Sequence, residues 1–496
     1  MTRQTRTPHL GDLPGDEFRR LLHEVADWVA DYREGIEARR VVPEQGPGAT
    51  SDRLPAAPPD AAEPMDEILR DFDRVIMPGI VHWGHPSFLG YFATTTTAPG
   101  ILGEMLAAAL NVSAMTWQTS PAATELETVV LDWIRQMLGL PPEFQGVVYD
   151  TASVAVLHAL AAAREALGFD VRRDGLAGRA DLPALTLYAS DQAHSSLEKA
   201  AITLGVGEAN VRRVATDGEY RMDVGALRLA IEGDVRAGRR PFAVVATVGT
   251  TSATSVDPVK EIAGVCREHG LWLHVDAAYG GAMALLEEGR HLMRAVDEAD
   301  SIAFNPHKWL YVPLDFSTLY VRRPESLRRV FSLVPEYLRG DAERAEGAAH
   351  NYMDYGIQLG RRFRALKAWF VIRAFGREGL AARVREACRL ARVFAGWVEA
   401  DERFELLAPV QMGVVCFRAR ALTGEASDEL NERLLSRLNA TGAVYLTHTR
   451  LGGRLALRVA VGNVLTREQH LAQAWELVRL HLTHLTEEAL DELRRP

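Results

Sequence analysis

Short apolar runs alternate with longer stretches of helical periodicity from about residue 100 onward. The short runs are rich in β-branched residues, which is typical of buried strands, whereas the stretches between them repeat apolar positions every three or four residues, as amphipathic helices do. Strands separated by helices indicate βαβ units and a largely parallel sheet. The predicted strands are GVVY at 146–149, LTLYAS at 185–190, FAVVATVG at 242–249, LWLHVD at 271–276, SIAF at 301–304 and STLYV at 317–321.

One of the intervening helices carries clear end signals in the sequence DPVKEIAGVCREHG. Asp257 is predicted to cap its first turn, because a carboxylate can accept the free backbone N–H groups there. Pro258 suits the first helical position, and Gly270 is predicted to end the helix.

The two ends of the chain have different patterns. Residues 17–39 carry apolar side chains at helical spacing, which predicts a helix. The stretch 41–64 that follows is rich in Pro, Gly and Ala and is predicted to be irregular. Beyond about residue 380, long helical patterns mix with short strands such as GVVCFRA and ALRVAVG, which predicts a smaller α+β domain.

Bulk properties narrow the class of protein. A chain of 496 residues exceeds what one hydrophobic core usually serves, so two or three domains are expected. The net charge of −10 disfavours nucleic acid and anionic membranes as partners, because phosphate contacts require a basic face. No stretch reads as a signal peptide or a membrane span, and Cys266, Cys388 and Cys416 are spaced for neither a metal nor a disulfide framework. We therefore expect a cytoplasmic protein without a metal site.

Polar residues gather where the predicted strands end. In a parallel α/β sheet the carboxyl ends of the strands meet at one edge, where functional groups collect. Asp276 closes one strand, Lys308 follows a second and His194 follows a third. Further polar residues stand at the same kind of position: Thr151, Ser153, Ser195, Ser196, Thr250, Thr251, Asn305 and His307.

Lys308 stands in the sequence FNPHKWLY, among residues that look interior. A buried lysine loses hydration, so it shifts its pKa, pairs with a charge or reacts. A desolvated amine can condense with an aldehyde, which is the group that pyridoxal phosphate offers. That cofactor also needs a carboxylate for its ring nitrogen, which Asp276 could supply. Its phosphate needs N–H groups at a helix N-terminus, which the segment DTASVAVLHAL offers.

Taken one at a time, these residues have commoner structural roles. A lysine or histidine after a strand is usually a core or surface residue, and an aspartate there usually caps a helix or pairs with an arginine. Their coincidence at one edge of the sheet favours the cofactor interpretation. His194 could then stack on one face of the ring, and Ala278 is small enough for the other face.

The motifs HVDAAYGG and NPHKW together resemble the signature of the group II pyridoxal-phosphate decarboxylases, and above all the aromatic L-amino acid decarboxylases. Nearly the whole chain shares the resemblance, because further segments follow in the family's order: EGIEARRVVP, IMPGIVHWGHPSFLGYF, SPAATELETVVLDW, SDQAHSSLEKA, GTTSATSVDP, GIQLGRRFRALKAWF and RAFGREGL. The resemblance implies a type I (aspartate aminotransferase-like) α/β fold that binds pyridoxal 5′-phosphate. The sheet domain would be large and mainly parallel, and the C-terminal α+β domain smaller.

The same resemblance implies a homodimer with its active site at the subunit interface. Residues 1–97 would be a helical segment that wraps the partner subunit. Residues 98–378 would form the large cofactor-binding α/β domain, and residues 379–496 the small C-terminal domain.

The resemblance also implies a role for each matching residue. Lys308 would hold the cofactor covalently, Asp276 would pair with its ring nitrogen, and His194 would stack above the ring. Ala278 would pack beneath the ring and Thr251 near it, with the phosphate held by Thr151, Ala152, Ser153, Asn305 and His307. Tyr337 would lie on a mobile loop that reaches over the partner's active site, and there it would protonate the product carbon, directly or through His194.

Residues expected around the substrate are Tyr91, Phe92, Thr94, Met115 and Gly360. Met115 replaces a phenylalanine that aromatic decarboxylases tend to carry, whereas Gly360 resembles the glycine of relatives that accept an indole ring. The apolar, aromatic lining predicts an aromatic L-amino acid, namely tryptophan, tyrosine, DOPA or phenylalanine, that is converted to its amine and CO₂. Asp150 stands where relatives usually have glycine, and its carboxylate would repel the phosphate unless it points away, for example toward a backbone N–H.

Other functions stay open at this point. Relatives that are aldehyde synthases, which couple decarboxylation to oxidative deamination, carry a different residue at the position of Tyr337 or His194, and this chain keeps both. Ser113 and Met115 leave room for a non-aromatic amino acid. Another carbon–carbon or carbon–sulfur lyase is a further alternative, and the last is a non-catalytic binding protein that keeps the fold.

Overall fold

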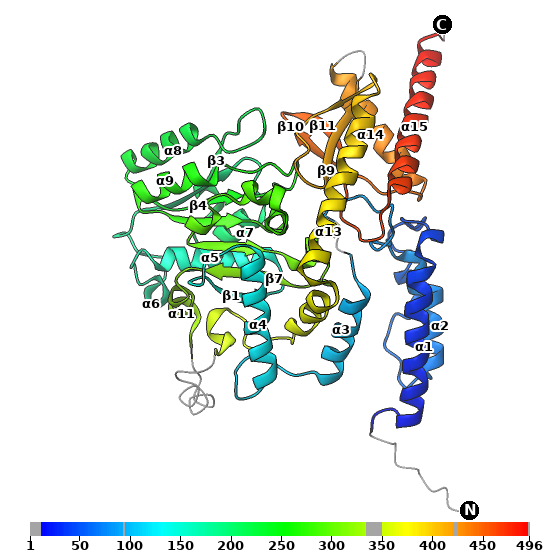
Figure 1. Ribbon diagram of the computed structural model, residues 1–496, viewed down its shortest axis with the longest axis horizontal. Coiled ribbons are helices and arrows are strands. Elements are labelled where there is room, and N and C mark those ends of the chain that lie inside the picture. Colours follow the sequence, from blue (N-terminus) through cyan, green and yellow to red (C-terminus); the bar gives the residue numbers. More distant parts are fainter. Residues whose placement is uncertain (1–10, 93–94, 334–349, 421–423, 495–496) are drawn as a thin grey trace, which may run out of the picture.

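The computed structural model describes residues 11–92, 95–333, 350–420 and 424–494 (Figure 1). Within them, a central sheet is built from β1 (Gln145–Tyr149), β2 (Leu185–Ser190), β3 (Val211–Val214), β4 (Arg240–Thr247), β5 (Trp272–Asp276), β6 (Ser301–Phe304) and β7 (Ser317–Val321). The strand order is β1-β7-β6-β5-β4-β2-β3. The pairs from β3 to β6 are parallel, whereas β7 runs antiparallel to both β1 and β6. This sheet confirms the predicted fold class.

All six strands predicted for this sheet are confirmed, with ends that differ by at most two residues. Strands β2 and β4 are buried on both faces, which is why they form unbroken apolar runs in the sequence. Strand β3 was not predicted. Its sequence VRRV is short, with two central arginines, so it lacks the apolar run that marks the other strands.

Helices cover both faces of the central sheet (Figure 1). On one face, α5 (Ala152–Glu165) contacts strands β4 to β7 and packs against α7 (Ser196–Thr203). On the other face, α8 (Val224–Arg236) and α9 (Val259–His269) contact β4. The first turns of α5 and α7 therefore begin at the carboxyl edge of the sheet, directly after β1 and β2.

Asp257 does not cap α9, so this prediction is wrong. The N-cap residue is Pro258, and the Asp257 carboxylate instead accepts the backbone N–H groups of Met222 (2.7 Å) and Thr247 (2.8 Å). The carboxylate therefore binds N–H groups of distant segments instead of those in the first turn of α9. Burial raises the pKa of Asp257 to about 6. Gly270 does end the helix as predicted, with φ 64°.

The C-terminal part contains a smaller, antiparallel sheet in the order β10-β11-β9-β8. Its strands are β8 (Phe404–Leu406), β9 (Val414–Ala419), β10 (Thr447–Leu451) and β11 (Arg454–Ala460), and it is accompanied by α14 (Gly424–Ala440) and α15 (Glu468–Arg494). Strands β9 and β11 confirm the two predicted here. The remaining two are shorter or more polar, with exposed residues alternating along β10.

The long helix α13 (Ala365–Glu399) connects the two parts. It contacts α3 (Ala98–Leu110) and α4 (Pro121–Met137) as well as β8 and β9 of the smaller sheet. Gly376, with φ 62°, interrupts the helical geometry close to the expected boundary between 378 and 379. The division of the chain into three parts stays a prediction.

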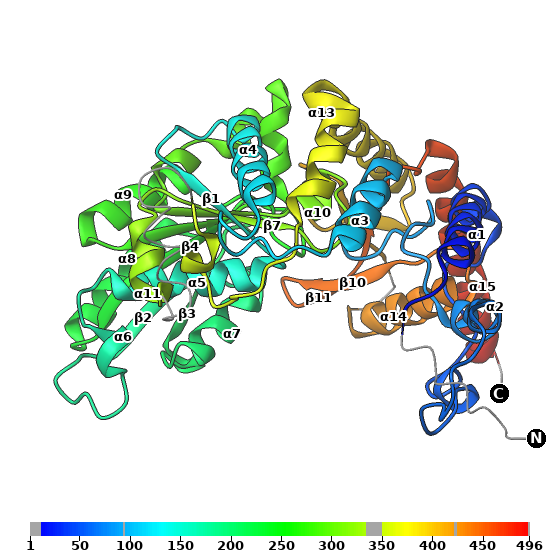
Figure 2. The ribbon, with the colours of Figure 1, turned by 90° about the horizontal axis from the view of Figure 1, so that it is seen from below.

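The N-terminal helices α1 (Gly15–Glu34) and α2 (Met65–Asp71) stand apart from the large sheet and lie below α15 in Figure 1, so that they overlap it in the view from below (Figure 2). Helix α1 confirms the helix expected within 17–39, which ends in a 3₁₀ turn at 36–38. The short helices α6 (Val171–Asp174), α10 (Pro306–Trp309) and α11 (Glu325–Phe331) complete the large part. Across the described ranges, no helix combines the length and apolar character needed to span a bilayer.

Candidate active site

Lys308, Asp276 and His194 line one pocket of about 200 Å³ at the carboxyl edge of the central sheet. Six segments that are far apart in the sequence contribute to it: five lie at the ends of strands β1, β2, β4, β5 and β6, and the sixth carries Phe92. Its lining residues are Phe92, Thr151, Ala152, Ser153, His194, Thr247, Gly249, Thr251, Asp276, Ala278, Tyr279, Asn305, His307 and Lys308. Every predicted cofactor-binding residue is in this set.

Lys308 lies in the short helix α10, directly after β6. Its Nζ is 4.7 Å from the centroid of the Phe92 ring. Burial is the main cause that lowers the pKa of the Lys308 amine to about 8; the charge of Asp276 opposes this lowering and the charge of Arg458 adds to it. A larger fraction of the amine is therefore neutral near neutral pH, which makes it a better nucleophile.

Arg458 is a second buried cation beside the pocket, and the sequence did not indicate it. Its guanidinium lies 4.8 Å from the Phe92 ring, and its pKa is lowered by burial. It donates to the backbone carbonyls of Tyr91 and Ser252 and makes no ion pair within the described residues. Because Arg458 lies on β11 of the smaller sheet, only the packing of that sheet brings it here.

Asp276 is the last residue of β5, and its Oδ1 accepts the backbone N–H of Ala278 at 3.0 Å. Thr247 is its register partner on the neighbouring strand β4, so both side chains stand on the same face of the sheet. The Thr247 hydroxyl lines the pocket and is buried, with no hydrogen-bond partner among the described residues. Sequence reasoning missed Thr247, although its position near the end of a predicted strand could have indicated it.

Two histidines in the pocket keep a neutral ring with the proton on Nε2. In His307 the Nδ1 atom accepts the backbone N–H of Phe316 (3.0 Å), and in His194 it accepts that of Ser196 (3.1 Å). Burial lowers the pKa of His307 to about 3 and is also the main cause that lowers the pKa of His194. Each ring can therefore donate a hydrogen bond through Nε2 without carrying a charge.

The first turn of α5 lines the pocket and can offer its backbone N–H groups to an anion. Helix α5 has 14 residues, and its N-cap Thr151 makes no side-chain cap, so the leading N–H groups of Ala152 and Ser153 are available. The Asp150 carboxylate accepts the Thr151 N–H at 2.7 Å. It thus points to a backbone N–H, but this N–H belongs to Thr151, which itself lines the pocket.

Of the residues expected around the substrate, Phe92 lines the Lys308 pocket, whereas the other described ones do not. Phe92 lines the pocket and stacks on Tyr279 at 4.0 Å between ring centroids. Tyr91 is 51% exposed and stacks on Trp83 instead. Within this chain, Met115 and Gly360 also lie away from the Lys308 pocket. Two further candidates, Thr94 and Tyr337, lie outside the described residues.

Segments 113–115 and 360–362 lie side by side, which brings Met115 and Gly360 to one place. Ser113 forms an isolated antiparallel bridge with Arg362, and the Ser113 hydroxyl accepts the backbone N–H of Arg361. The Arg361 guanidinium forms a buried ion pair with Glu127 at 2.6 Å and also donates to the Ala114 carbonyl. This pair fixes the two segments on α4.

The pocket fits pyridoxal 5′-phosphate in its donor set. It combines an amine of lowered pKa, a carboxylate on the neighbouring strand, and free N–H groups at a helix start. The buried Thr247 hydroxyl lacks a hydrogen-bond partner within the described chain, and the Nε2–H of His307 is a further donor among the pocket residues. A polar cofactor would satisfy these groups, because a buried polar atom without a hydrogen bond is costly.

Comparisons with known proteins agree with this chemistry. The model of the pyridoxal-dependent decarboxylase conserved domain matches residues 47–420. The chain is 42% identical to aromatic-L-amino-acid decarboxylase of Sus scrofa over 476 residues, which cover 93% of this chain and 96% of that protein. The fold is similar to a crystal structure of Oryza sativa TDC with PLP and tryptamine, with a TM-score of 0.91, 40% identity, and coverage of 96% of this chain and 99% of that one. A crystal structure of Rhodiola rosea 4-hydroxyphenylacetaldehyde synthase is also similar, with a TM-score of 0.87, 36% identity, and coverage of 95% and 99%.

Proposed function

The chain belongs to the pyridoxal-dependent decarboxylase family, and from this premise we propose that its substrate is an aromatic L-amino acid, such as tryptophan, tyrosine, DOPA or phenylalanine. The protein is a carboxy-lyase of amino acid metabolism that uses pyridoxal 5′-phosphate and releases the amine and CO₂. The observation that carries the proposal is the grouping of Lys308, Asp276 and His194 around one pocket in a chain of this family.

Each residue of the pocket would have a definite task. Pyridoxal 5′-phosphate, when bound, supplies an aldehyde for amines and a ring that withdraws electrons from the bond to be broken. Lys308 would hold it covalently, since its lowered pKa keeps part of its amine neutral. Asp276 would accept a hydrogen bond from the protonated ring nitrogen, and the N–H groups at the start of α5 would bind the phosphate.

The faces of the ring would be held by His194 and Ala278, and the remaining predicted contacts would come from Thr251, Asn305 and His307. His194 lines the pocket and presents an Nε2–H, which suits a group that orients a substrate carboxylate or relays a proton. We assign the protonation of the product carbon to Tyr337, acting directly or through His194.

The preference for an aromatic side chain has two supports. The Sus scrofa relative is an aromatic-L-amino-acid decarboxylase, and the Oryza sativa structure contains tryptamine. The pocket also offers the stacked rings of Phe92 and Tyr279 as an apolar surface. The test is to measure CO₂ release from tryptophan, tyrosine, phenylalanine, DOPA, histidine and glutamate. Faster turnover of histidine or glutamate would refute the aromatic assignment.

An aldehyde synthase is the second candidate, because the Rhodiola rosea structure is similar over 95% of the chain. The presence of both His194 and Tyr337 favours plain decarboxylation. Ammonia and hydrogen peroxide should be measured together with CO₂. Ammonia that is formed in step with CO₂ would show oxidative deamination and would reject the main proposal.

We further propose that the enzyme is a cytoplasmic homodimer whose active site includes partner residues. Exposed apolar side chains on α3 support this, since Leu102, Leu106 and Leu110 are 55%, 49% and 59% exposed. Tyr91, Met115 and Gly360 would then meet the partner's pocket. Lys308→Ala and Tyr337→Phe subunits should each lose amine formation, and mixing them should restore about one quarter of the wild-type rate of amine formation if Tyr337 acts across the interface. No recovery would refute that arrangement.

A further inference from the structure

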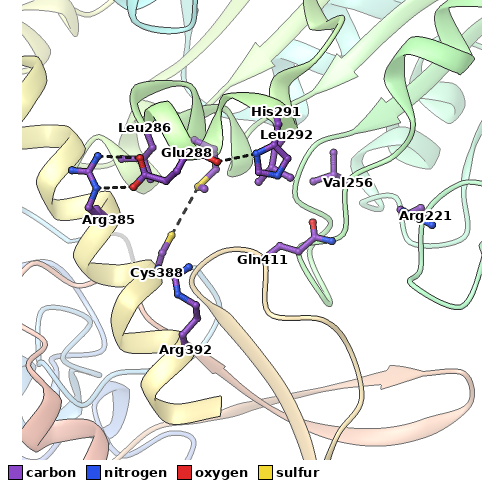
Figure 3. Close-up of a pocket in the computed structure, with 11 residues that line it drawn as sticks. Arg221, Val256, Leu286, Glu288, His291, Leu292, Arg385, Cys388, Arg392 and Gln411 are labelled. Carbon is purple, nitrogen blue, oxygen red and sulfur yellow. Dashed lines mark hydrogen bonds and ion pairs between the residues drawn. The ribbon is translucent and has the colours of Figure 1, made fainter. Parts of the chain in front are cut away.

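A second cleft, of about 670 Å³, shares no lining residue with the Lys308 pocket (Figure 3). It lies between α13, the 3₁₀ segment 280–293 and the loop that carries Gln411. Its apolar surface comes from Val256, Met283, Leu286, Leu292 and Cys388. The cleft is large enough for a small organic molecule with an apolar body.

The ionic groups around this cleft leave one positive charge unpaired. Arg385 forms an ion pair with Glu288 at 2.7 Å. Arg221 pairs with two carboxylates of its own loop, at 2.8 and 2.9 Å. Arg392 lines the cleft and is exposed; it makes no hydrogen bond or ion pair within the described residues, although its charge is one of the causes that lower the pKa of Glu288. It stands four residues beyond Cys388 on α13, so both side chains face the cleft.

Gln411 adds a second unsatisfied group on the opposite wall (Figure 3). Its side-chain Oε1 is buried and has no hydrogen-bond partner among the described residues. A ligand that donates one hydrogen bond would relieve this, because an unpaired buried acceptor is unfavourable. The cleft thus presents a cation, an acceptor and an apolar floor in one cavity.

The wall that carries Gln411 also supports the cofactor pocket. The next residue, Met412, packs against Gly249, where an added Cβ would lie 3.3 Å from the Met412 sulfur. An added Cβ on Gly413 would lie 2.7 Å from the hydroxyl oxygen of Tyr279. Gly249 and Tyr279 both line the Lys308 pocket, so segment 411–413 contacts both cavities.

We propose that this cleft binds an amphiphilic organic anion, with its anionic head on Arg392, its apolar body on the cleft floor and one donor to Gln411. We infer that its occupancy is coupled to the cofactor pocket through segment 411–413. The coupling, but not the binding, rests on the proposed cofactor-dependent function.

The binding can be tested with 8-anilinonaphthalene-1-sulfonate, which carries a sulfonate, a fused aromatic body and one N–H. We expect its fluorescence titration on the cofactor-loaded enzyme to contain one component that weakens about tenfold in Arg392→Ala. Gln411→Leu should weaken the same component by a smaller factor. The matched control is Arg377→Ala, because Arg377 is an exposed arginine of the same helix that does not line the cleft. Equal affinities in Arg392→Ala and Arg377→Ala, with unchanged thermal unfolding, would overturn the site.

The coupling can be tested by repeating the titration on cofactor-free protein, with cofactor loading followed by visible absorbance. The affinity of the Arg392-dependent component should differ at least about twofold between the two forms, and the dye should change cofactor affinity by the same factor. Equal affinities would overturn the coupling. A protein that shows no cofactor absorbance would instead refute the proposed function, and the binding result would remain.

Discussion

Arg361 and Lys308 are two cationic residues near the same sheet, and they differ in whether a carboxylate pairs with them. The Arg361 guanidinium, on the segment before α13, donates to both Glu127 oxygens and to the carbonyls of Ala114 and Val148. Lys308 has no ion pair within the described residues, although Asp276 lines the same pocket. A buried charge with a full set of partners ties segments together, whereas one without them lowers stability and persists where chemistry requires it.

The largest expected effect comes from removing the unpaired charge. Lys308→Ala should lower CO₂ release by about 10³-fold or more, because no other amine lines the pocket with it. The free energy of unfolding of the cofactor-free protein should stay the same or rise, since a buried charge without a partner is removed. Retention of more than a small fraction of the activity would show that Lys308 has another role.

Removing one partner of the paired charge should give the opposite result. Glu127→Ala leaves the Arg361 guanidinium buried without its carboxylate, and we expect it to lower the free energy of unfolding by about 3–5 kcal/mol. Urea unfolding measures this change. The double variant Glu127→Ala/Arg361→Met is the control and should lose less, because no uncompensated charge remains. A double variant that loses as much stability as Glu127→Ala alone, or more, would contradict the pairing argument.

The pKa of Lys308 predicts a pH profile. Its folded-state pKa is lowered from 10.5 to about 8, so the neutral amine increases about tenfold per pH unit below 8 and levels off above it. The rate at which cofactor-free protein captures pyridoxal 5′-phosphate, followed by visible absorbance, should show this shape. Arg458→Met should move the midpoint upward, since Arg458 lowers the Lys308 pKa. A rate that still rises steeply at pH 10 would show that burial does not perturb this amine.

The smallest expected effect comes from removing a single buried hydroxyl, either one without a hydrogen-bond partner (Thr247) or one with a partner (Thr250). Thr247→Val removes a buried hydroxyl that has no partner within the described residues, so stability should be unchanged or higher. Cofactor affinity should fall roughly fivefold if that hydroxyl binds the cofactor.

Thr250→Val is the matched control, because its hydroxyl accepts the backbone N–H of Ser255 at 3.0 Å. It should lower stability instead, by about 1 kcal/mol. Identical behaviour of the two variants would show that Thr247 is only structural.

The sequence predicted those parts of the site that follow from strand ends. Asp276 stands at the end of a strand with a strong apolar pattern, and Lys308 and His194 each stand just beyond such a strand, so their meeting could be inferred. Thr247 belongs to the same edge but is hidden inside an apolar run. Arg458 could not be inferred this way, because its strand belongs to the other sheet.

Local signals were less informative where distant partners compete. Asp257 is followed by a proline and a helical pattern, as an N-cap would be, yet its carboxylate binds N–H groups of Met222 and Thr247. Asp150 seemed misplaced beside a phosphate site, and its carboxylate binds the Thr151 N–H. The backbone N–H that a carboxylate binds depends on which segments pack against it, and the neighbouring residues in the sequence do not show this.

By itself, the sequence determined six of the seven strands of the large sheet, the sheet edge where the chemistry gathers, and the residue types that pyridoxal 5′-phosphate requires. These follow from periodicity and from short motifs, which are properties of neighbouring residues. The tertiary structure alone decided which buried charges are paired, how far the pKa of Lys308 falls, and which cavities share a wall. Burial and electrostatic interaction depend on distances between atoms from remote parts of the chain, and those distances exist only after folding.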